Sequence, residues 1–289
     1  MKTRILTLAV LTLALAACSK SDPETPADGN SVAATFNAEI TPATRVNTEG
    51  TDWSEGDRVG ITGAGYTNIP YVVNNGKFAA NGTIIYFQST ETETFNAYYP
   101  YQTDGGVVAV TTDAAHQGTG IDFLFASGAT GSTSNPEVSF TGDHAFKHCM
   151  SLIKLIFKAG DGITFADLKP ASYTIGGLKL EGTFDTATGT TAVTASAAAP
   201  ITMQLDGATQ SQVIIFPQEV TADPDLTVTF NSQSYKATLQ KPTKPAAGFY
   251  SAGYAYTYTV TINNTGITVE AAGIAPWEGG DSNDVSVEL

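Results

Sequence analysis

The residues best suited to chemistry are concentrated in the short stretch "HAFKHC", which contains His144, His148 and Cys149. Imidazole and thiolate groups bind zinc, and two histidines four residues apart on an α-helix would share one face. The surrounding "SFTGDHAFKHCMSLIKLIF" is instead typical of strand, loop and strand, which would separate the two imidazoles. Because no second pair of ligands occurs elsewhere in the sequence, we expect no metal site and no other cofactor.

The sequence also lacks the common catalytic patterns. It contains neither a Gly-x-Ser-x-Gly motif nor a phosphate-binding loop, and its acidic residues are scattered along the chain. We therefore expect no catalytic residues. Trp53 and Trp277 leave two alternatives open, because an exposed tryptophan can stack on a sugar whereas a buried one packs in a core.

Residues 1–17 have the pattern of a secretory signal peptide, with Lys2 and Arg4 followed by an apolar stretch. That stretch is too short to cross the roughly 30 Å of a membrane core as a helix. The segment "LAAC" resembles a bacterial lipobox, in which a peptidase cuts before the cysteine. We therefore expect Cys18 to carry acyl chains such as palmitate, and two or more chains hold a protein durably at a membrane. An ordinary signal peptide with a chance cysteine is the alternative.

Residues 18–31 are polar and contain Pro, Asp and Gly, a composition typical of a tether. Loss of residues 1–17 would leave 12 basic and 28 acidic residues, a net charge of −16. Such an acidic chain is poorly suited to bind nucleic acid or to adhere to anionic lipid by charge. With Cys18 acylated, Cys149 would have no partner for an intramolecular disulfide, so stability would have to come from the core.

The elements that would position these residues are predicted to be β-strands. From Val32 to Ile40, apolar residues alternate with the residues between them, which indicates a strand with one buried face. Similar short patterns recur between Gly, Asn, Asp and Pro, so the fold class is predicted to be all-β. This spacing favours β-sandwiches over barrels, without excluding barrels. We expect an N-terminal domain at residues 32–148 and a C-terminal domain at 149–289.

The predicted strands are "RVGIT", "GTIIYFQ", "TFNAYYPY", "GVVAVTT", "PEVSFTG", "SLIKLIFKA", "SYTIGGLKLEGTF", "SQVIIFPQ", "LTVTFNSQSYKATL", "YAYTYTVTI" and "GITVEA".

The segment "TRVNTEGTDWSEGDRVGI" resembles the signature of the fimbrillin family of Bacteroidales, lipoprotein precursors of the type V pilus. The family pattern is a Thr-Arg pair, a variable gap, and Trp-x-x-Gly-Asp before a hydrophobic strand. It is carried here by Thr44, Arg45, Trp53, Gly56, Asp57, Val59 and Ile61. "FNAYYPY", "DFLFASG", "VSFTGDHAFKHCMSLIKLIF", "GFYSAGYAYTYTVTI" and "IAPW" fit the family in the same order.

This resemblance implies two transthyretin-like β-sandwich domains in tandem and no catalysis. It also implies that an arginine-specific protease cuts after the arginine that follows the first strand, which is the bond between Arg45 and Val46. Pro42 would end that strand, and residues 41–50 are polar, like the exposed loops that proteases reach. The alternative is that Arg45 is a solvated surface charge.

Cleavage would free the first strand, with Phe36, Ala38 and Ile40 on its buried face, and would expose an open strand edge. A strand from another chain could fill both the backbone ladder and the side-chain pockets. The tail "DVSVEL" is a candidate donor strand, with Val285, Val287 and Leu289 on one face. Head-to-tail contacts of this kind build filaments. Alternatively, the tail is the last strand of the second domain.

These features predict an outer membrane lipoprotein precursor that becomes a structural subunit of a cell-surface pilus and supports adhesion. Its expected partners are other pilin subunits in a homo- or heteropolymer, an arginine-specific protease, and the outer membrane through its lipid. No nucleic acid is expected as a partner. The alternatives are a tip or anchor subunit of the same pilus, or a non-polymerising surface lipoprotein that binds glycan or host protein.

Overall fold

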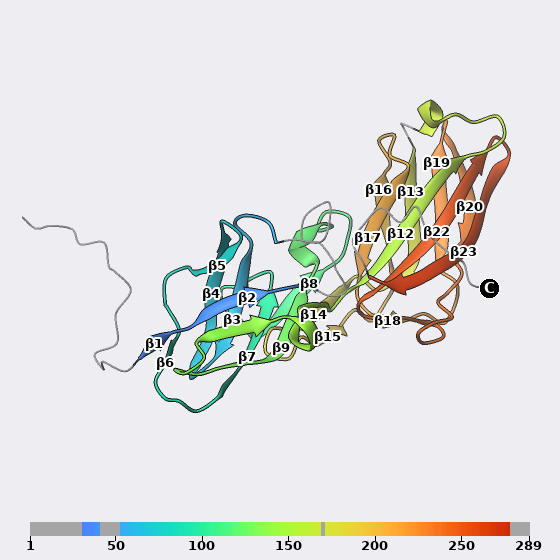
Figure 1. Cartoon of the computed structure of the whole chain (residues 1–289). Coiled ribbons are helices and arrows are strands. Elements are labelled where there is room, and N and C mark those ends of the chain that lie inside the picture. The colour runs from blue at the N-terminus through green and yellow to red at the C-terminus, as the bar shows by residue number, and fades with distance from the viewer. Residues whose placement is uncertain (1–30, 41–52, 169–170, 278–289) are drawn as a thin grey trace, which may run out of the picture.

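The computed structural model describes residues 31–40, 53–168 and 171–277. Within these ranges the regular elements are β-strands and short 3-10 helices, so the all-β prediction is confirmed. Figure 1 shows them as two lobes, one built mainly from β1–β11 and the other mainly from β12–β23. None of the described helices is long and apolar enough to cross a membrane. The 3-10 helices are η1 (Thr119–Ile121), η2 (Gly142–His144) and η3 (Phe165–Leu168).

In the N-terminal lobe, eight of the described strands form one sheet in the order β10-β2-β5-β4-β3-β7-β9-β11. The strand β2 runs parallel to β10 and antiparallel to β5. A separate pair joins β1 (Val32–Ala33) to β6 (Tyr86–Phe87). The strands of the sheet are β2 (Thr35–Ala38), β3 (Arg58–Gly63), β4 (Tyr66–Asn74), β5 (Lys77–Ala80), β7 (Glu93–Tyr99), β9 (Leu124–Gly131), β10 (Glu137–Phe140) and β11 (Lys147–His148).

The C-terminal lobe has two four-stranded sheets among its described residues, in the orders β17-β12-β22-β23 and β16-β13-β19-β20. Alternate side chains of these strands enter one shared core, as in β22, where Tyr256, Tyr258, Val260 and Ile262 are fully buried. The strands are β12 (Ser151–Ala159), β13 (Ser172–Leu178), β16 (Ala199–Gln204), β17 (Gln210–Ile215), β19 (Asp225–Phe230), β20 (Gln233–Thr238), β22 (Tyr254–Asn263) and β23 (Gly266–Pro276). A short pair, β18 (Gln218–Glu219) and β21 (Phe249–Tyr250), lies beside them.

A small sheet joins chain segments from both sides of the predicted boundary at residue 148. Its order is β15-β14-β8, in which β8 (Val107–Thr111) pairs with β14 (Glu181–Asp185), and β14 with β15 (Thr191–Val193). A separate apolar cluster lies at this junction and includes residues from both lobes. The hairpin of β14 and β15 therefore reaches from the second half of the chain to a strand of the first.

Two predicted strands are each divided in the structure. "SYTIGGLKLEGTF" forms β13 and β14, which belong to different sheets, and the chain turns near Gly177, whose φ is +84°. "LTVTFNSQSYKATL" is a hairpin of β19 and β20 that turns at Asn231 and Ser232, where φ is 50° and 62°. The strand β4 was missed because it contains Pro70, a residue that disfavours strand interiors.

Candidate functional site

The structure describes the predicted first strand and leaves the other predicted site residues outside its described ranges. Phe36 and Ala38 lie in β2, and Ile40 forms an isolated parallel bridge with Phe146 just beyond it. In Figure 1, β2 runs across the front of the N-terminal lobe. The predicted lipidation site Cys18, the Arg45–Val46 bond, and the tail residues Val285, Val287 and Leu289 lie outside the described residues.

Backbone hydrogen bonds hold β2 along both of its edges, though unequally. On the β10 side, β2 is paired over its whole length, from Thr35 with Glu137 to Ala38 with Phe140. On the other side, within the described chain, β5 pairs with β2 at one position, Phe36 with Phe78. The N–H of Ala34 completes that edge by donating to the Ile85 carbonyl at 2.9 Å. The β5 edge of β2 is therefore the weaker one.

From Ala34 to Ile40 the side chains follow the predicted period of two except at Asn37 and Ala38, which are both half-buried. Ala34, Phe36 and Ile40 are buried, whereas Thr35 and Glu39 are exposed. The ring of Phe36 packs edge-on against Tyr71 and Phe95, with centroids 4.8 and 5.6 Å apart, and stacks on Phe140 at 6.4 Å. Full burial of a phenylalanine contributes about 1.5–3 kcal/mol. Phe36 is thus the main apolar anchor of the strand.

An apolar gap lies beneath β2, next to the small side chain of Ala38. It is too narrow to hold a water molecule. Close by, the Oδ1 atom of Asn37 is buried with no hydrogen-bond partner in the part of the chain that the structure describes. A narrow apolar gap and one polar atom without a described partner therefore mark this end of β2. The gap is lined by Phe36, Asn37, Ala38, Val59, Ile61, Phe78, Ala97, Phe140 and Phe146.

Trp53, the first residue of the Trp-x-x-Gly-Asp signature, lies against the same end of β2. Its indole Nε1 donates a hydrogen bond to the Ala38 carbonyl at 3.2 Å. Its ring is packed edge-on against Phe78, Tyr99 and Phe146, with centroids 5.2, 5.6 and 5.0 Å away. The structure therefore gives Trp53, which is half-buried, a packing role.

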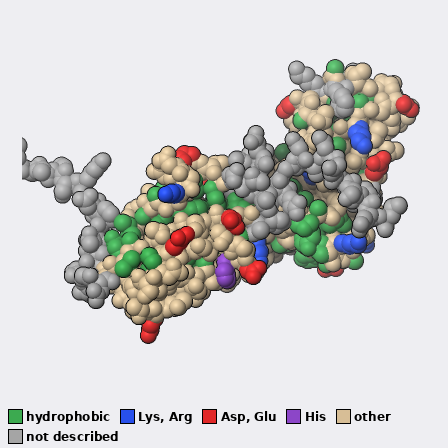
Figure 2. Space-filling model, viewed as in Figure 1, with side chains coloured by type: hydrophobic (Ala, Val, Ile, Leu, Met, Phe, Trp, Pro, Cys, Tyr) green, Lys and Arg blue, Asp and Glu red, His purple; other side chains and the backbone are tan. Residues whose placement is uncertain are grey.

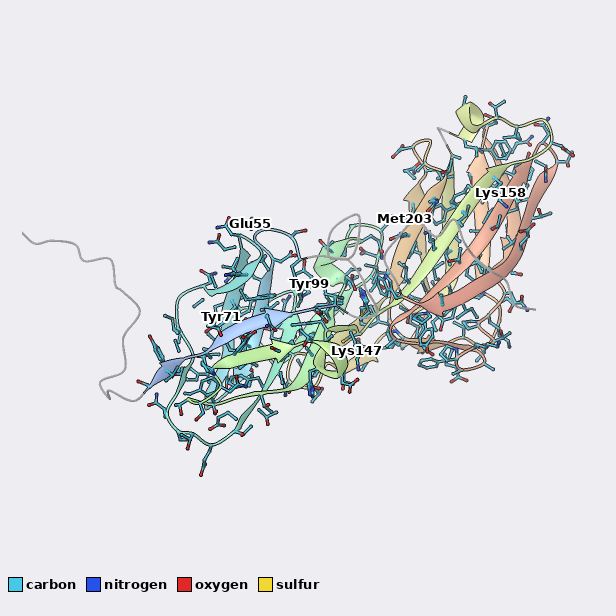
Figure 3. All side chains as sticks on the ribbon, viewed as in Figure 1. Glu55, Tyr71, Tyr99, Lys147, Lys158 and Met203 are labelled. Carbon is cyan, nitrogen blue, oxygen red and sulfur yellow. The ribbon has the colours of Figure 1, made fainter. Side chains whose placement is uncertain are left out.

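Asp57 holds the turn that follows Trp53. Its Oδ2 accepts the Ser54 N–H at 2.7 Å, and its Oδ1 accepts the hydroxyl of Tyr99 at 3.2 Å. Desolvation raises the pKa of the Asp57 carboxyl above its usual value, and these two hydrogen bonds oppose the shift. Gly56 completes the turn with φ +89°, a conformation that favours glycine. Tyr71 and Tyr99, labelled in Figure 3, belong to the same lobe.

The structure places His144 and His148 in different elements. His144 ends η2 and its Nδ1 contacts the Ser127 carbonyl at 2.9 Å, whereas His148 lies in β11 and its Nδ1 contacts Asp122 Oδ1 at 2.6 Å. The two imidazoles do not share a helical face, because neither lies in an α-helix. Across the described ranges, no group of three or more His, Cys, Asp or Glu side chains is arranged to hold a metal ion.

His148 belongs to a buried cluster at the junction of the lobes that the sequence did not indicate. Its ring stacks on Trp277, with centroids 4.0 Å apart and planes 10° apart. Trp277 is itself buried, and its backbone N–H donates to the Gly253 carbonyl at 2.7 Å. Asp122 and Cys149 lie close by, and burial, followed by the charge of Asp122, raises the pKa of the Cys149 thiol to about 12. Trp277 thus also packs within the protein.

The charged groups give no second candidate on the face that Figure 2 shows. Acidic side chains are scattered over both lobes there, with a few Lys and Arg side chains between them. The place of β2, which is the slot between β10 and β5, is therefore the candidate functional site.

The chain was compared with known protein families, sequences and solved structures. The sequence model of the family described as fimbrillin-like matches residues 44–277. The chain is 30% identical over 305 aligned residues to a Bacteroides uniformis protein with the provisional name fimbrium subunit Fim1C, and the match covers 97% of each.

Two solved structures are also similar, both described as candidate cell adhesion proteins. The one from Bacteroides uniformis has a TM-score of 0.70 at 26% identity, over 86% of this chain and 99% of that chain. The one from Bacteroides ovatus has a TM-score of 0.70 at 27% identity, with the same two coverages. The family resemblance that the sequence indicated is confirmed, and the chain belongs to the fimbrillin-like family.

Proposed function

We propose that this chain is a structural subunit of a type V pilus that polymerises by donor-strand exchange and supports adhesion. Its precursor is a lipoprotein with a signal peptide at residues 1–17, acyl chains on Cys18 and a tether at 18–31. The folded part consists of two transthyretin-like β-sandwich domains in tandem, at 32–148 and 149–289. No catalytic role is proposed.

We propose that assembly proceeds by cleavage, release of the first strand and its replacement. An arginine-specific protease cuts the bond between Arg45 and Val46, and the segment that carries Phe36, Ala38 and Ile40 then leaves. The tail of another subunit, with Val285, Val287 and Leu289 on one face, takes its place. The subunit passes in this way from the outer membrane to a homo- or heteropolymeric pilus on the cell surface.

The single observation that supports this function best is the position of β2. It is a short strand between β10 and β5, joined to the rest of the chain through residues 41–52, which contain Arg45. Its departure would leave two strand edges with unpaired backbone groups above an apolar floor that includes Phe95 and Phe140. Such a slot requires a replacement strand, since unpaired backbone groups and apolar side chains are both costly to leave there.

The test is limited proteolysis of the purified precursor that lacks residues 1–18. We expect one cut between Arg45 and Val46 by intact mass, followed by a ladder of oligomers on an SDS gel without boiling. The variant Arg45→Gln, treated in the same way, is expected to stay intact and monomeric. A cut without a ladder would indicate a tip subunit or a missing partner subunit. Resistance of the wild-type bond would contradict the proposal and favour an anchored, non-polymerising binder.

A further inference from the structure

We propose that Trp53 anchors the weakly paired edge of the strand that occupies the place of β2. It does so by donating its indole N–H to the backbone carbonyl at position 38. In the uncut chain that carbonyl belongs to Ala38. After exchange it belongs to the incoming strand, and this second part rests on the proposed function.

The direction of the hydrogen bonds along β2 places the Ala38 carbonyl on the weaker edge. The N–H groups of Thr35 and Glu39 donate toward β10, to the carbonyls of Pro136 and Phe140, each at 2.9 Å. Successive residues of a strand direct their backbone groups to opposite edges, so Ala38 faces the β5 side. Within the described chain, β5 pairs with β2 only as far as Phe36. The hydrogen bond to the Ala38 carbonyl is therefore donated by the indole of Trp53 and not by a backbone N–H of β5.

The indole is well placed to act as a fixed donor. Three aromatic rings surround it, those of Phe78, Tyr99 and Phe146, and these come from different parts of the lobe. The next residues form a turn held by Asp57, whose carboxyl binds the Ser54 N–H and the Tyr99 hydroxyl. Because packing and this turn already hold the Trp53 side chain, it loses little conformational entropy when its N–H donates a hydrogen bond.

The bond does not depend on the side chain at position 38, because its acceptor is a backbone carbonyl. Every residue carries a carbonyl, so Trp53 can serve an incoming strand of any sequence. A slip of two residues would present another carbonyl to the same indole, so the register is left to the side-chain pockets, and Trp53 fastens the strand without selecting its side chains.

The role in the uncut chain is tested by hydrogen exchange on the precursor that lacks residues 1–18. The variant Trp53→Phe keeps an aromatic ring and loses the donor. A second variant carries the benzothiophene analogue of tryptophan at position 53, which keeps the bicyclic shape and replaces N–H by sulfur. We expect residues 34–40 to exchange about fivefold faster in both, the effect of one lost hydrogen bond.

The matched control is Trp277→Phe, the same change at a tryptophan that does not touch β2. It should leave the exchange of residues 34–40 unchanged. The proposal is overturned if the benzothiophene variant exchanges like the wild type in these residues. It is also overturned if Trp277→Phe accelerates them equally, since general destabilisation would then explain the effect.

The second part of the proposal, that the Trp53 indole also binds the incoming strand, is tested on protease-cut protein with a synthetic peptide of residues 278–289. The peptide carries a photo-crosslinking side chain at position 287. We expect the same crosslinks in both proteins and about fivefold weaker binding in the benzothiophene variant. Equal affinity in both proteins would overturn this second part of the proposal. If the wild type binds no peptide, the proposed donor role and this second part both fail, while hydrogen exchange still decides the role of Trp53 in the uncut chain.

Discussion

At the scale of single residues, Ala38 and Trp53 lie at the end of β2 where pairing with β5 has stopped. Ala38 lines the narrow apolar gap, and Trp53 binds its carbonyl. The strand is therefore fastened at this end by one side-chain hydrogen bond. Because the gap is too narrow for a water molecule, a larger side chain at position 38 has no free space to enter.

The change Ala38→Val is expected to lower the free energy of unfolding by about 1–3 kcal/mol, because the added methyl groups overpack the narrow gap. Urea unfolding measures this change, and release of the strand after proteolysis should accelerate in parallel. The control Thr35→Val places a side chain of the same kind on the exposed face of the same strand. Equal destabilisation by both variants would contradict the packing argument.

Cys149 is expected to resist alkylation in the native protein. Burial raises the pKa of its thiol to about 12, so the reactive thiolate is scarce at neutral pH. Because the folded pKa lies above the usual value of about 8.5, the folded state favours the neutral thiol, and this contribution to stability is lost as pH rises between the two values. Iodoacetamide labelling read by mass should be slow in buffer and fast in urea. Equal rates would contradict the burial of this thiol.

At the scale of elements, the hairpin of β14 and β15 depends on close packing at Gly182. A Cβ added there would lie 2.4 Å from the Ala192 carbonyl oxygen and 2.7 Å from the ring of Phe216. Both neighbours lie in the second half of the chain, while β14 pairs with β8 of the first half. Gly182 therefore allows one short strand to lie against the core and bridge the lobes.

The change Gly182→Ala is expected to lower the free energy of unfolding by about 1–3 kcal/mol, because backbone and a buried ring must both shift. Denaturant unfolding measures it. Gly120→Ala is the matched control, since a Cβ at Gly120 meets nothing within 4 Å. A loss of equal size in the control would attribute the effect to glycine flexibility in general and would contradict the packing argument.

At the scale of the whole molecule, the two lobes of Figure 1 meet at a junction that contains a buried polar pair. His148 and Asp122 are held 2.6 Å apart, and Trp277 stacks on the histidine ring. The Nε2 atom of His148 is buried and has no hydrogen-bond partner among the described residues. The junction therefore combines this buried polar pair with the small sheet of β8, β14 and β15 and an apolar cluster.

The change Trp277→Ala is expected to cost about 3–5 kcal/mol, the usual range for a buried tryptophan, and to loosen the junction. Small-angle X-ray scattering should then give a larger radius of gyration at unchanged mass. Val107→Ala, which alters an exposed side chain near the junction, should leave the radius unchanged. An unchanged radius in the tryptophan variant would show that the small sheet alone fixes the lobes.

The sequence by itself determined the local properties of this protein. The alternation from Val32 to Ile40 indicated a strand with one buried face, because residues on one face of a strand recur with a period of two wherever the strand pairs. Most strands and the all-β class could be identified for the same reason, whereas the family resemblance came from the residues of the Trp-x-x-Gly-Asp signature. The cleavage site, the lipidation site and the donor tail stay predictions.

Only the tertiary structure decided which strands pair and which side chains contact one another. The strand β2 pairs in parallel with β10, which lies about a hundred positions away in the chain, and β8 pairs with β14 across the predicted boundary. The partner of Trp53 is a backbone carbonyl, which leaves no trace in the residue types, and Asp122 reaches His148 from a distant segment. Periodicity and turn preferences act over a few residues, whereas these contacts depend on how all the strands pack into one core.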